Sequence, residues 1–271
     1  MTHARFERHT KDWVPMPTAR RLFASVLAGL ALVGMAAVPA DASHSWNGYH
    51  WARTTNPFTL SLGDNVSSTW DSILATTSSD WSQSTVLDTT VVAGRAASVK
   101  RCGASTGRVE VCNTTYGNTG WLGIAQVRVS GSHITQGVVK LNDTYFNTAT
   151  YNTVPWRNMV MCQEVGHILG LDHQDENFAN ANLGTCMDYS NDPSTNQNPN
   201  QHDYDELATI YSHPDSTTTV GMAVAGSAAV GGNDPSAWGR AIRTSGDARP
   251  SLYERNLGGG RAVFTFVIWA E

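Results

Sequence analysis

The chain has 271 residues, with 18 Lys and Arg against 23 Asp and Glu, and only 15% of its residues are charged. The formal net charge of -5 leaves no basic surface for nucleic acid, and 41% hydrophobic residues can form a core, which excludes wholesale disorder. The length allows one large domain, or one domain with a small addition.

Residues 1–42 have the layout of a secretory signal peptide. Five basic residues precede an uncharged run over 22–38, and a small-x-small cleavage site ends at Ala42. The run is shorter than the roughly 20 residues that span a membrane comfortably. We therefore expect a secreted, extracellular chain that keeps no stable membrane anchor. The pair Arg20-Arg21 leaves a twin-arginine export route open beside the general one.

All four cysteines follow this leader. An even number in an oxidising compartment indicates two disulfide bonds, and four cysteines allow three pairings. Pairing of neighbours along the sequence gives Cys102–Cys112 and Cys162–Cys186. The alternative is a free, reactive thiol at Cys162.

Residues 43–213 predict strands first and helices later. Alternating apolar residues indicate strands over 56–63, 86–92, 108–112, 121–130 and 138–141. Apolar residues at helical spacing indicate helices over 67–82 and 203–211, and a third helix that begins near Pro155 and ends at Gly170. Residues 174–203 are rich in Asn, Asp, Gly and Pro, which is typical of a loop. This order of elements indicates an α+β domain.

The composition changes after this domain. Residues 214–235 are rich in Thr, Gly, Ala and Ser, which predicts a flexible linker. In the final part, 236–271, the segments 251–256 and 261–269 flank three consecutive glycines, a pattern that predicts a β-hairpin. An isolated hairpin is marginal in water, so we expect this small C-terminal extension to pack on other residues.

The segment 163–173 carries the clearest chemistry. Gln163 and His167 are one turn apart on one helix face, so their side chains can converge on one metal ion. Gly170 lets the chain leave the helix and turn back, which allows His173 to reach the same point. Glu164 lies beside the first donor, where a carboxylate can take a proton from water. Two imidazoles, a third donor and a general base are the parts of a hydrolytic zinc site.

This segment resembles the zinc signature of the metzincin metallopeptidases, His-Glu-x-x-His-x-x-Gly-x-x-His. Glu164, His167, Gly170 and His173 match it, and Gln163 stands where the family has its first histidine. The resemblance covers roughly residues 50–213. It implies a metzincin-like catalytic domain with a twisted mixed sheet, an active-site helix, a Met-turn and a C-terminal helix.

A second stretch, 185–189, resembles the Met-turn of the same family, in which a methionine lies beneath the zinc. Its Met-x-Tyr form, here Met187 and Tyr189, is similar to that of the astacin and serralysin branches, where the tyrosine is a fifth ligand or stabilises the tetrahedral intermediate. The residues around both stretches also resemble a group of secreted bacterial metzincin-like proteins with a Gln at this position and both cysteines. In this resemblance a Cys162–Cys186 bond would tie the helix to the Met-turn.

The resemblance implies a secreted zinc endopeptidase that acts on protein or peptide substrates as a monomer. One catalytic zinc ion would be held by His167, His173 and Gln163, with Gly170 and Met187 as structural support. Glu164 would activate water for attack on the peptide bond, and Tyr189 would stabilise the oxyanion.

Three features of the sequence allow two interpretations each. An amide oxygen suits zinc less well than an imidazole, so Gln163 also fits a non-catalytic exported binding protein with a degenerate metal site. The strand over 121–130 is either the sheet edge that pairs with an extended substrate or an ordinary strand. Four oxygen donors either bind calcium or form a solvated acidic loop; they are Asp172, Asp175, Glu176 and Asn177.

Overall fold

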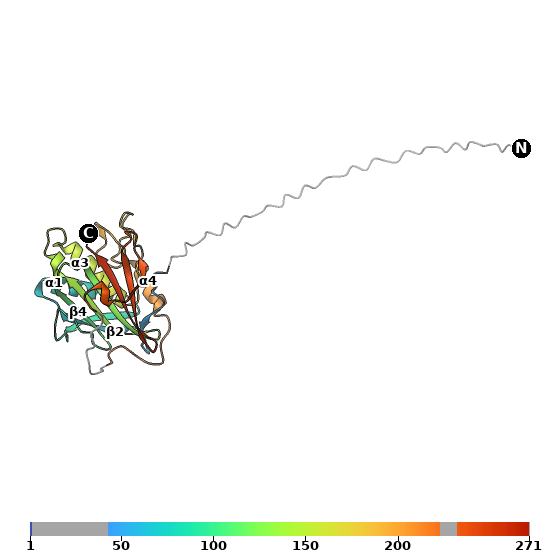
Figure 1. Cartoon of the computed structure of the whole chain (residues 1–271). Helices are drawn as coiled ribbons and strands as arrows, with labels where there is room; N and C mark the ends of the chain where they lie inside the picture. The colour runs from blue at the N-terminus through green and yellow to red at the C-terminus, as the bar shows by residue number, and fades with distance from the viewer. Residues whose placement is uncertain (2–42, 223–231, 271) are drawn as a thin grey trace, which may run out of the picture. The chain divides into compact units, whose positions relative to one another are not determined.

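The computed structural model describes residues 43–222 and 232–270, together with Met1. The predicted signal peptide and residues 223–231 of the predicted linker lie outside this description. The described chain from Ser43 onward belongs to one unit, Asp41–Glu271, and Figure 1 shows its helices and strands. Within these ranges, no helix has both the length and the apolar character needed to cross a membrane.

Every helix and strand predicted in 43–271 is present. The helices are α1 (Ser68–Trp81), α2 (Asp143–Phe146), α3 (Val154–Ile168) and α4 (Gln201–Ile210). The strands are β1 (His50–Trp51), β2 (Phe58–Asn65), β3 (Leu87–Ala93), β4 (Val109–Thr114), β5 (Trp121–Ser130), β6 (His133–Asn142), β7 (Arg240–Thr244), β8 (Pro250–Gly258) and β9 (Arg261–Trp269). The elements β1, α2 and β7 were not predicted, because each is too short to show a periodic pattern.

The strands form one mixed sheet in the order β3-β2-β4-β6-β5-β9-β8-β7, with β1 beside β6. The pairs β1–β6, β2–β3, β2–β4 and β4–β6 are parallel. The pairs β6–β5, β5–β9, β9–β8 and β8–β7 are antiparallel. The predicted α+β class with a mixed sheet is therefore confirmed.

Helices α1 and α3 pack on each other, and α3 also packs on β5 and β6. The layer between them contains large, fully buried side chains such as Trp70, Trp81 and Ile168. Burial of a side chain of this kind stabilises the fold by about 1.5–3 kcal/mol. This packing holds α3 in a fixed position against the middle of the sheet.

Local sequence sets both ends of α3. At its start, the Thr153 hydroxyl accepts a hydrogen bond from the Trp156 backbone N–H, and Pro155 lies in the first turn. At its end, Gly170 has a φ of 106°, in the left-handed region that favours glycine. A Cβ atom there would lie 2.6 Å from the Tyr49 carbonyl oxygen. The predicted stop at Gly170 is therefore confirmed.

The predicted C-terminal hairpin forms, but it is part of the main sheet and not a separate extension. Strand β9 pairs with β5 over their whole lengths, from Trp121 opposite Trp269 to Ser130 opposite Arg261. Inward side chains of β9, including Phe266, belong to the main core. A two-stranded hairpin cannot bury its apolar face alone, so it joins the strand that offers free backbone groups.

Strand β5 is consequently an interior strand. It pairs with β6 on one side and with β9 on the other. The interpretation of 121–130 as a sheet edge open to a substrate is wrong for this arrangement, because both rows of backbone hydrogen-bonding groups are already used.

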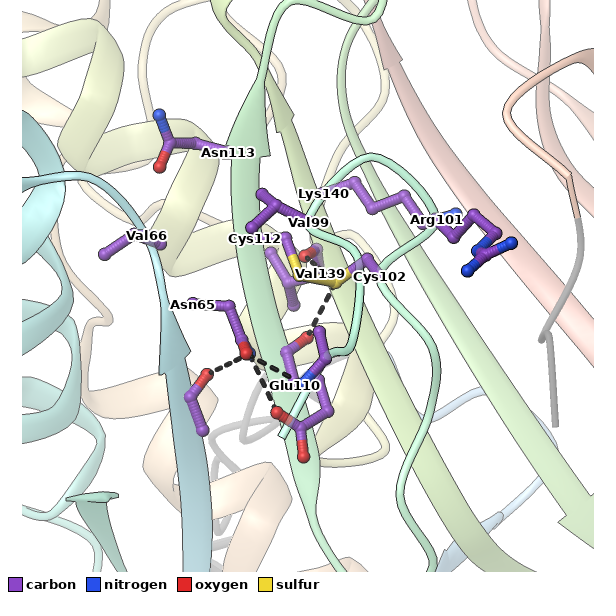
Figure 2. The surroundings of a disulfide bond; sticks show 12 residues. Asn65, Val66, Val99, Arg101, Cys102, Glu110, Cys112, Asn113, Val139 and Lys140 are labelled. Atoms are coloured by element: carbon purple, nitrogen blue, oxygen red, sulfur yellow. Dashed lines mark hydrogen bonds between the residues drawn. A yellow bond between two sulfur atoms is a disulfide. The ribbon is translucent and has the colours of Figure 1, made fainter. Parts of the chain in front are cut away.

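Both disulfide bonds of the neighbour pairing are present, Cys102–Cys112 and Cys162–Cys186, and the described residues contain no free cysteine. Figure 2 shows the first bond, which joins Cys112 on β4 to the loop that carries Cys102. Two disulfides fit an oxidising compartment, as expected for an exported protein.

The described part of the predicted linker, 214–222, is bonded to the start of the chain. The N–H groups of Asp215 and Thr219 donate to the carbonyls of Arg53 and Ala52, at 2.7 and 2.8 Å. These backbone bonds hold the segment beside β1, which differs from the flexible linker that the composition predicts.

Candidate functional site

Three aromatic side chains fix the end of α3. Trp46, Trp51 and Tyr211 donate hydrogen bonds to the carbonyls of residues 167, 168 and 169, at 3.2, 2.9 and 2.9 Å respectively. The last carbonyls of a helix lack partners inside the helix. These donors therefore satisfy the last carbonyls of α3 in a buried place, at the helix end that carries the first histidine.

The imidazole rings of His167 and His173 meet edge to face at this end. Their Nε2 atoms are 3.0 Å apart, with an angle of 87° between the ring planes. Two ligands held about 2.0–2.1 Å from a tetrahedral zinc ion lie about 3.3 Å apart. The turn at Gly170 thus brings the second histidine to a spacing close to that of two ligands of one ion.

The other nitrogen of each ring has its own acceptor. Nδ1 of His167 lies 2.9 Å from the Leu171 carbonyl oxygen, and Nδ1 of His173 lies 2.7 Å from Oε1 of Glu176. These acceptors assign the ring protons to Nδ1, so the two Nε2 lone pairs face each other. Burial, together with the charge of His173, lowers the pKa of His167 well below its usual value. The two Nε2 atoms thus point toward each other, as two ligands of one cation would.

Gln163 and Glu164 occupy the preceding turn of α3, and both side chains are completely buried. None of their four polar atoms has a hydrogen-bond partner of normal geometry among the described residues. A buried polar group without a hydrogen-bond partner lowers the stability of the fold by about 1–3 kcal/mol. A contribution to stability therefore does not explain why polar residues occupy this turn. Unpartnered donor and acceptor atoms next to the histidine pair indicate a place for a further ligand.

The surroundings of Glu164 favour its neutral form. Burial raises the pKa of its carboxyl well above the usual range, and the backbone amide of Ala125 opposes this shift only in part. Space for the carboxyl comes from Gly123 on β5, where a Cβ atom would lie 2.9 Å from Oε1 of Glu164.

The predicted Met-turn lies against α3. A Cβ atom at Gly166 would lie 2.5 Å from the Met187 sulfur, so only glycine allows this close approach. The Cys162–Cys186 bond joins the same helix to the residue before Met187. The N–H of Gln174 donates to the Met187 carbonyl at 2.7 Å, which connects the turn to the segment after the second histidine.

Strand β9 covers the histidine pair. The Phe266 ring stacks on the His167 ring, with centroids 4.0 Å apart and 11° between the planes. The Tyr189 hydroxyl donates to the Val267 carbonyl at 2.8 Å, and its ring centroid is 4.4 Å from that of His173. Burial raises the pKa of Tyr189 well above its usual value, so the hydroxyl keeps its proton and remains a donor.

An arginine from β7 pairs with the acidic loop after the second histidine. The Arg243 guanidinium contacts Asp172 and lies 3.6 Å from Oε1 of Glu176. Asp175 accepts a hydrogen bond from the backbone of Asn177 instead. These carboxylates are paired with groups of the protein itself. Asp172, His173 and Glu176 nevertheless offer ligand atoms within 4.8 Å of one another, so the calcium site considered for this loop stays a prediction.

An open pocket of about 340 Å³ borders the site. It is lined by residues 43–45, 172–176 and Arg243. Its lining includes His173 but neither His167 nor Glu164.

The structure brings the predicted residues into one region, with the histidines in contact, Tyr189 beside His173, and Gln163 and Glu164 one turn away. The sequence did not reveal the roles of Glu176 as partner of a histidine or of Phe266 as its cover. A carboxylate three residues after His173 was a usable local signal, whereas the contact of Phe266 depends on strand pairing between remote segments. Comparison with models of known protein families and with curated proteins gives no match for this chain.

Proposed function

We propose that this protein is an exported zinc-dependent endopeptidase of the metzincin type, whose site is covered by its own strand β9. The proposal depends above all on the Nε2 atoms of His167 and His173, which are 3.0 Å apart while both Nδ1 atoms have acceptors. The contact of Met187 with α3 supports the assignment to this type.

His167, His173 and Gln163 would hold the zinc ion. A histidine whose Nδ1 donates to a carboxylate, as His173 does to Glu176, is the usual arrangement behind a metal ligand. The unpartnered amide of Gln163 supports it as the third donor, although an amide binds zinc more weakly than an imidazole. When bound, zinc polarises a carbonyl group and lowers the pKa of water to about 7.

Glu164 would be the general base of the reaction. A zinc ion nearby would favour the ionised carboxylate over the neutral form that burial favours. That carboxylate would take a proton from the attacking water and pass it to the leaving amine. Tyr189 would donate its hydroxyl proton to the oxygen on which negative charge develops. In the covered state the same hydroxyl donates to Val267.

Strand β9 has two features of a bound peptide. It pairs antiparallel with β5, as an extended substrate pairs with the edge of a sheet. Its carbonyl at Val267 accepts the hydrogen bond that Tyr189 would give to a substrate carbonyl. These features support a self-blocked enzyme in which β9 must leave before a substrate binds.

The second candidate is a non-catalytic exported binding protein. The observation that favours it is the same strand, because β9 is paired along its length and Phe266 lies directly on His167. In that case the histidine pair would bind a metal ion without turnover.

Zinc content and peptide cleavage of the purified chain test the proposal. We expect one zinc ion at the histidine pair, cleavage that a chelator abolishes, and a loss of cleavage by about 10²–10⁴-fold in Glu164→Ala. The control is Glu254→Ala on β8, outside the site. Zinc binding without cleavage, even after β9 is weakened, would indicate the binding protein. Absence of zinc from His167 and His173 would contradict both candidates.

The variant Gln163→His tests the third donor. We expect at least tenfold tighter zinc binding, measured by competition with a chelating dye, because imidazole is the better ligand. The control is Gln197→His, which adds a histidine to the loop before α4. Unchanged affinity in Gln163→His would show that residue 163 does not contribute to the site.

A further inference from the structure

Three histidines surround one carboxylate oxygen of Asp215, which lies in the segment that follows α4. Their Nε2 atoms lie 3.4, 3.2 and 3.9 Å from Oδ1 of Asp215, for His50, His133 and His213 respectively. The rings of His133 and His213 each stand edge to face against His50, with centroids 5.0 Å apart. None of these four residues belongs to the site on α3.

The backbone brings these residues together. His50 on β1 and His133 on β6 are direct partners in a parallel pair of strands, so their side chains lie on the same face. The segment after α4 lies along the residues that follow β1, because the Asp215 N–H donates to the Arg53 carbonyl at 2.7 Å. This bond places His213 and Asp215 beside the histidine pair of the sheet.

The groups around the cluster orient its donor atoms. Nδ1 of His50 lies 2.7 Å from the Gly48 carbonyl oxygen, and its Nε2 lies 3.4 Å from Oδ1 of Asp215, so the ring is held with Nε2 toward the centre of the cluster. Arg53 binds the other carboxylate oxygen, Oδ2, through its guanidinium at 2.9 Å and its backbone N–H at 3.2 Å. Oδ1 is therefore left for the centre of the cluster. Partners of this kind commonly fix the ligands of a metal ion from outside.

We propose that His50, His133, His213 and Asp215 bind one divalent transition-metal ion, with zinc as the best match. Three imidazoles and one carboxylate form a complete tetrahedral set for zinc. The ligand atoms of His50, His133 and Asp215 all lie within 4.8 Å of one another. Nε2 of His213 lies 3.9 Å from Oδ1 of Asp215, against a spacing of about 3.3 Å between the ligands of a tetrahedral zinc ion, so His213 would have to move closer to complete the set.

Hydrogen bonding alone explains the cluster less well. At 3.9 Å, Nε2 of His213 is too far from Oδ1 to donate a hydrogen bond, so its ring contact with His50 is its only described link to a purely hydrogen-bonded group. A metal ion at the centre gives all four side chains a partner. The side chains of His133 and His213 are 32% and 57% exposed, which lets an ion enter from solvent.

The ion would act as a clamp between segments remote in the sequence. It would join β1, β6 and the segment that follows α4. Since Trp51, the neighbour of His50, donates to the carbonyl of Ile168, the clamp would also hold the end of α3. The inference does not rest on the proposed peptidase activity.

Zinc stoichiometry of the full chain, measured after exhaustive dialysis, tests the proposal. We expect His213→Ala and His133→Ala each to bind one zinc ion fewer than the parent, or to bind it at least tenfold more weakly. The control His202→Ala, which removes a histidine outside both clusters, should bind as the parent does. His213 is the most exposed member, so its replacement should not prevent folding.

The variant His173→Ala distinguishes zinc bound at the histidine pair of α3 from zinc bound at the Asp215 cluster. This variant should keep the zinc ion of the Asp215 cluster, and its Co²⁺ complex should show the absorption of a tetrahedral nitrogen and oxygen site. Unchanged zinc binding in both His213→Ala and His133→Ala would overturn the inference. Zinc lost in His213→Ala but not in His173→Ala would support the cluster and contradict the proposed peptidase site.

Discussion

Lys140 is a positive charge inside the sheet, with no exposed surface. It lies on β6 next to the Cys102–Cys112 bond (Figure 2), and its Nζ donates to the side-chain oxygen of Asn233 at 2.8 Å. Burial lowers the pKa of Lys140 to about 8, because a charged ammonium loses its hydration there. The cost of this charge should appear in the pH dependence of stability.

The direction of this pH dependence follows from the protonation of Lys140 in the folded and in the unfolded chain. Below pH 8 the lysine is charged in both the folded and the unfolded chain, and the burial cost is fully present. Between pH 8 and about 10.5 only the unfolded chain keeps the proton, so the contribution of Lys140 to stability rises with pH. We expect Lys140→Met to raise the free energy of unfolding by about 2–3 kcal/mol at pH 7, and by much less at pH 10.

Urea unfolding of parent and variant at both pH values measures this difference. The control is Lys100→Met, which changes an exposed lysine. A difference between parent and Lys140→Met that does not depend on pH would contradict the expectation.

At the scale of elements, α3 and the turn at Met187 form one unit. Gly166 allows their close approach, and the Cys162–Cys186 bond joins them covalently. The other bond, Cys102–Cys112, holds a loop to β4, away from the histidine pair. The two bonds should therefore contribute similarly to stability but differently to metal binding.

Replacement of each cysteine pair by alanine tests this distinction. From the lengths of the closed loops, we expect removal of Cys162–Cys186 and Cys102–Cys112 to lower the free energy of unfolding by about 3.5 and 3 kcal/mol. Only the first change should weaken zinc binding to the α3 site, because only it loosens the turn beneath the helix. Thermal unfolding and zinc titration of both variants give the answer. Equal loss of zinc affinity in both variants would count against the connection of the bond to the site.

At the scale of the whole molecule, the position of β9 decides whether the site is open. Phe264 and Phe266 lie on the same face of this strand, and both are buried. Phe266 stacks on His167, whereas Phe264 packs on Trp46 and Tyr49. The two residues form a matched pair for separating stability from access.

We expect Phe266→Ala and Phe264→Ala to lower the free energy of unfolding by similar amounts, about 3–5 kcal/mol. Only Phe266→Ala should speed peptide cleavage and zinc exchange, because it uncovers His167. Phe266→Leu keeps most of the side-chain volume. It should also speed cleavage and zinc exchange, and it should lower the free energy of unfolding by less than about 1.5 kcal/mol. Hydrogen exchange of the β9 amides and cleavage rates measure both effects. Equal rates in the two alanine variants would show that β9 does not block the site.

The sequence by itself determined the features that depend on neighbouring residues. Thr153, Pro155 and Gly170 set the ends of α3, because helix ends are decided within a few residues. The alternation of apolar residues located the predicted strands, and the spacing of the cysteines led to the observed pairing. The mixed sheet was expected only from the resemblance of the 163–173 and 185–189 segments to a known family, since the direction of strand pairing is not a local property.

Tertiary structure alone decided which remote segments meet. The pairing of β9 with β5, and with it the cover on His167, depends on which strand offers free backbone groups once the rest of the sheet has formed. The assembly of His50, His133 and Asp215 likewise needs the register between β1 and β6 and the return of the chain after α4. No local pattern records such contacts, because their free energy comes from burial and pairing between segments that the sequence keeps far apart.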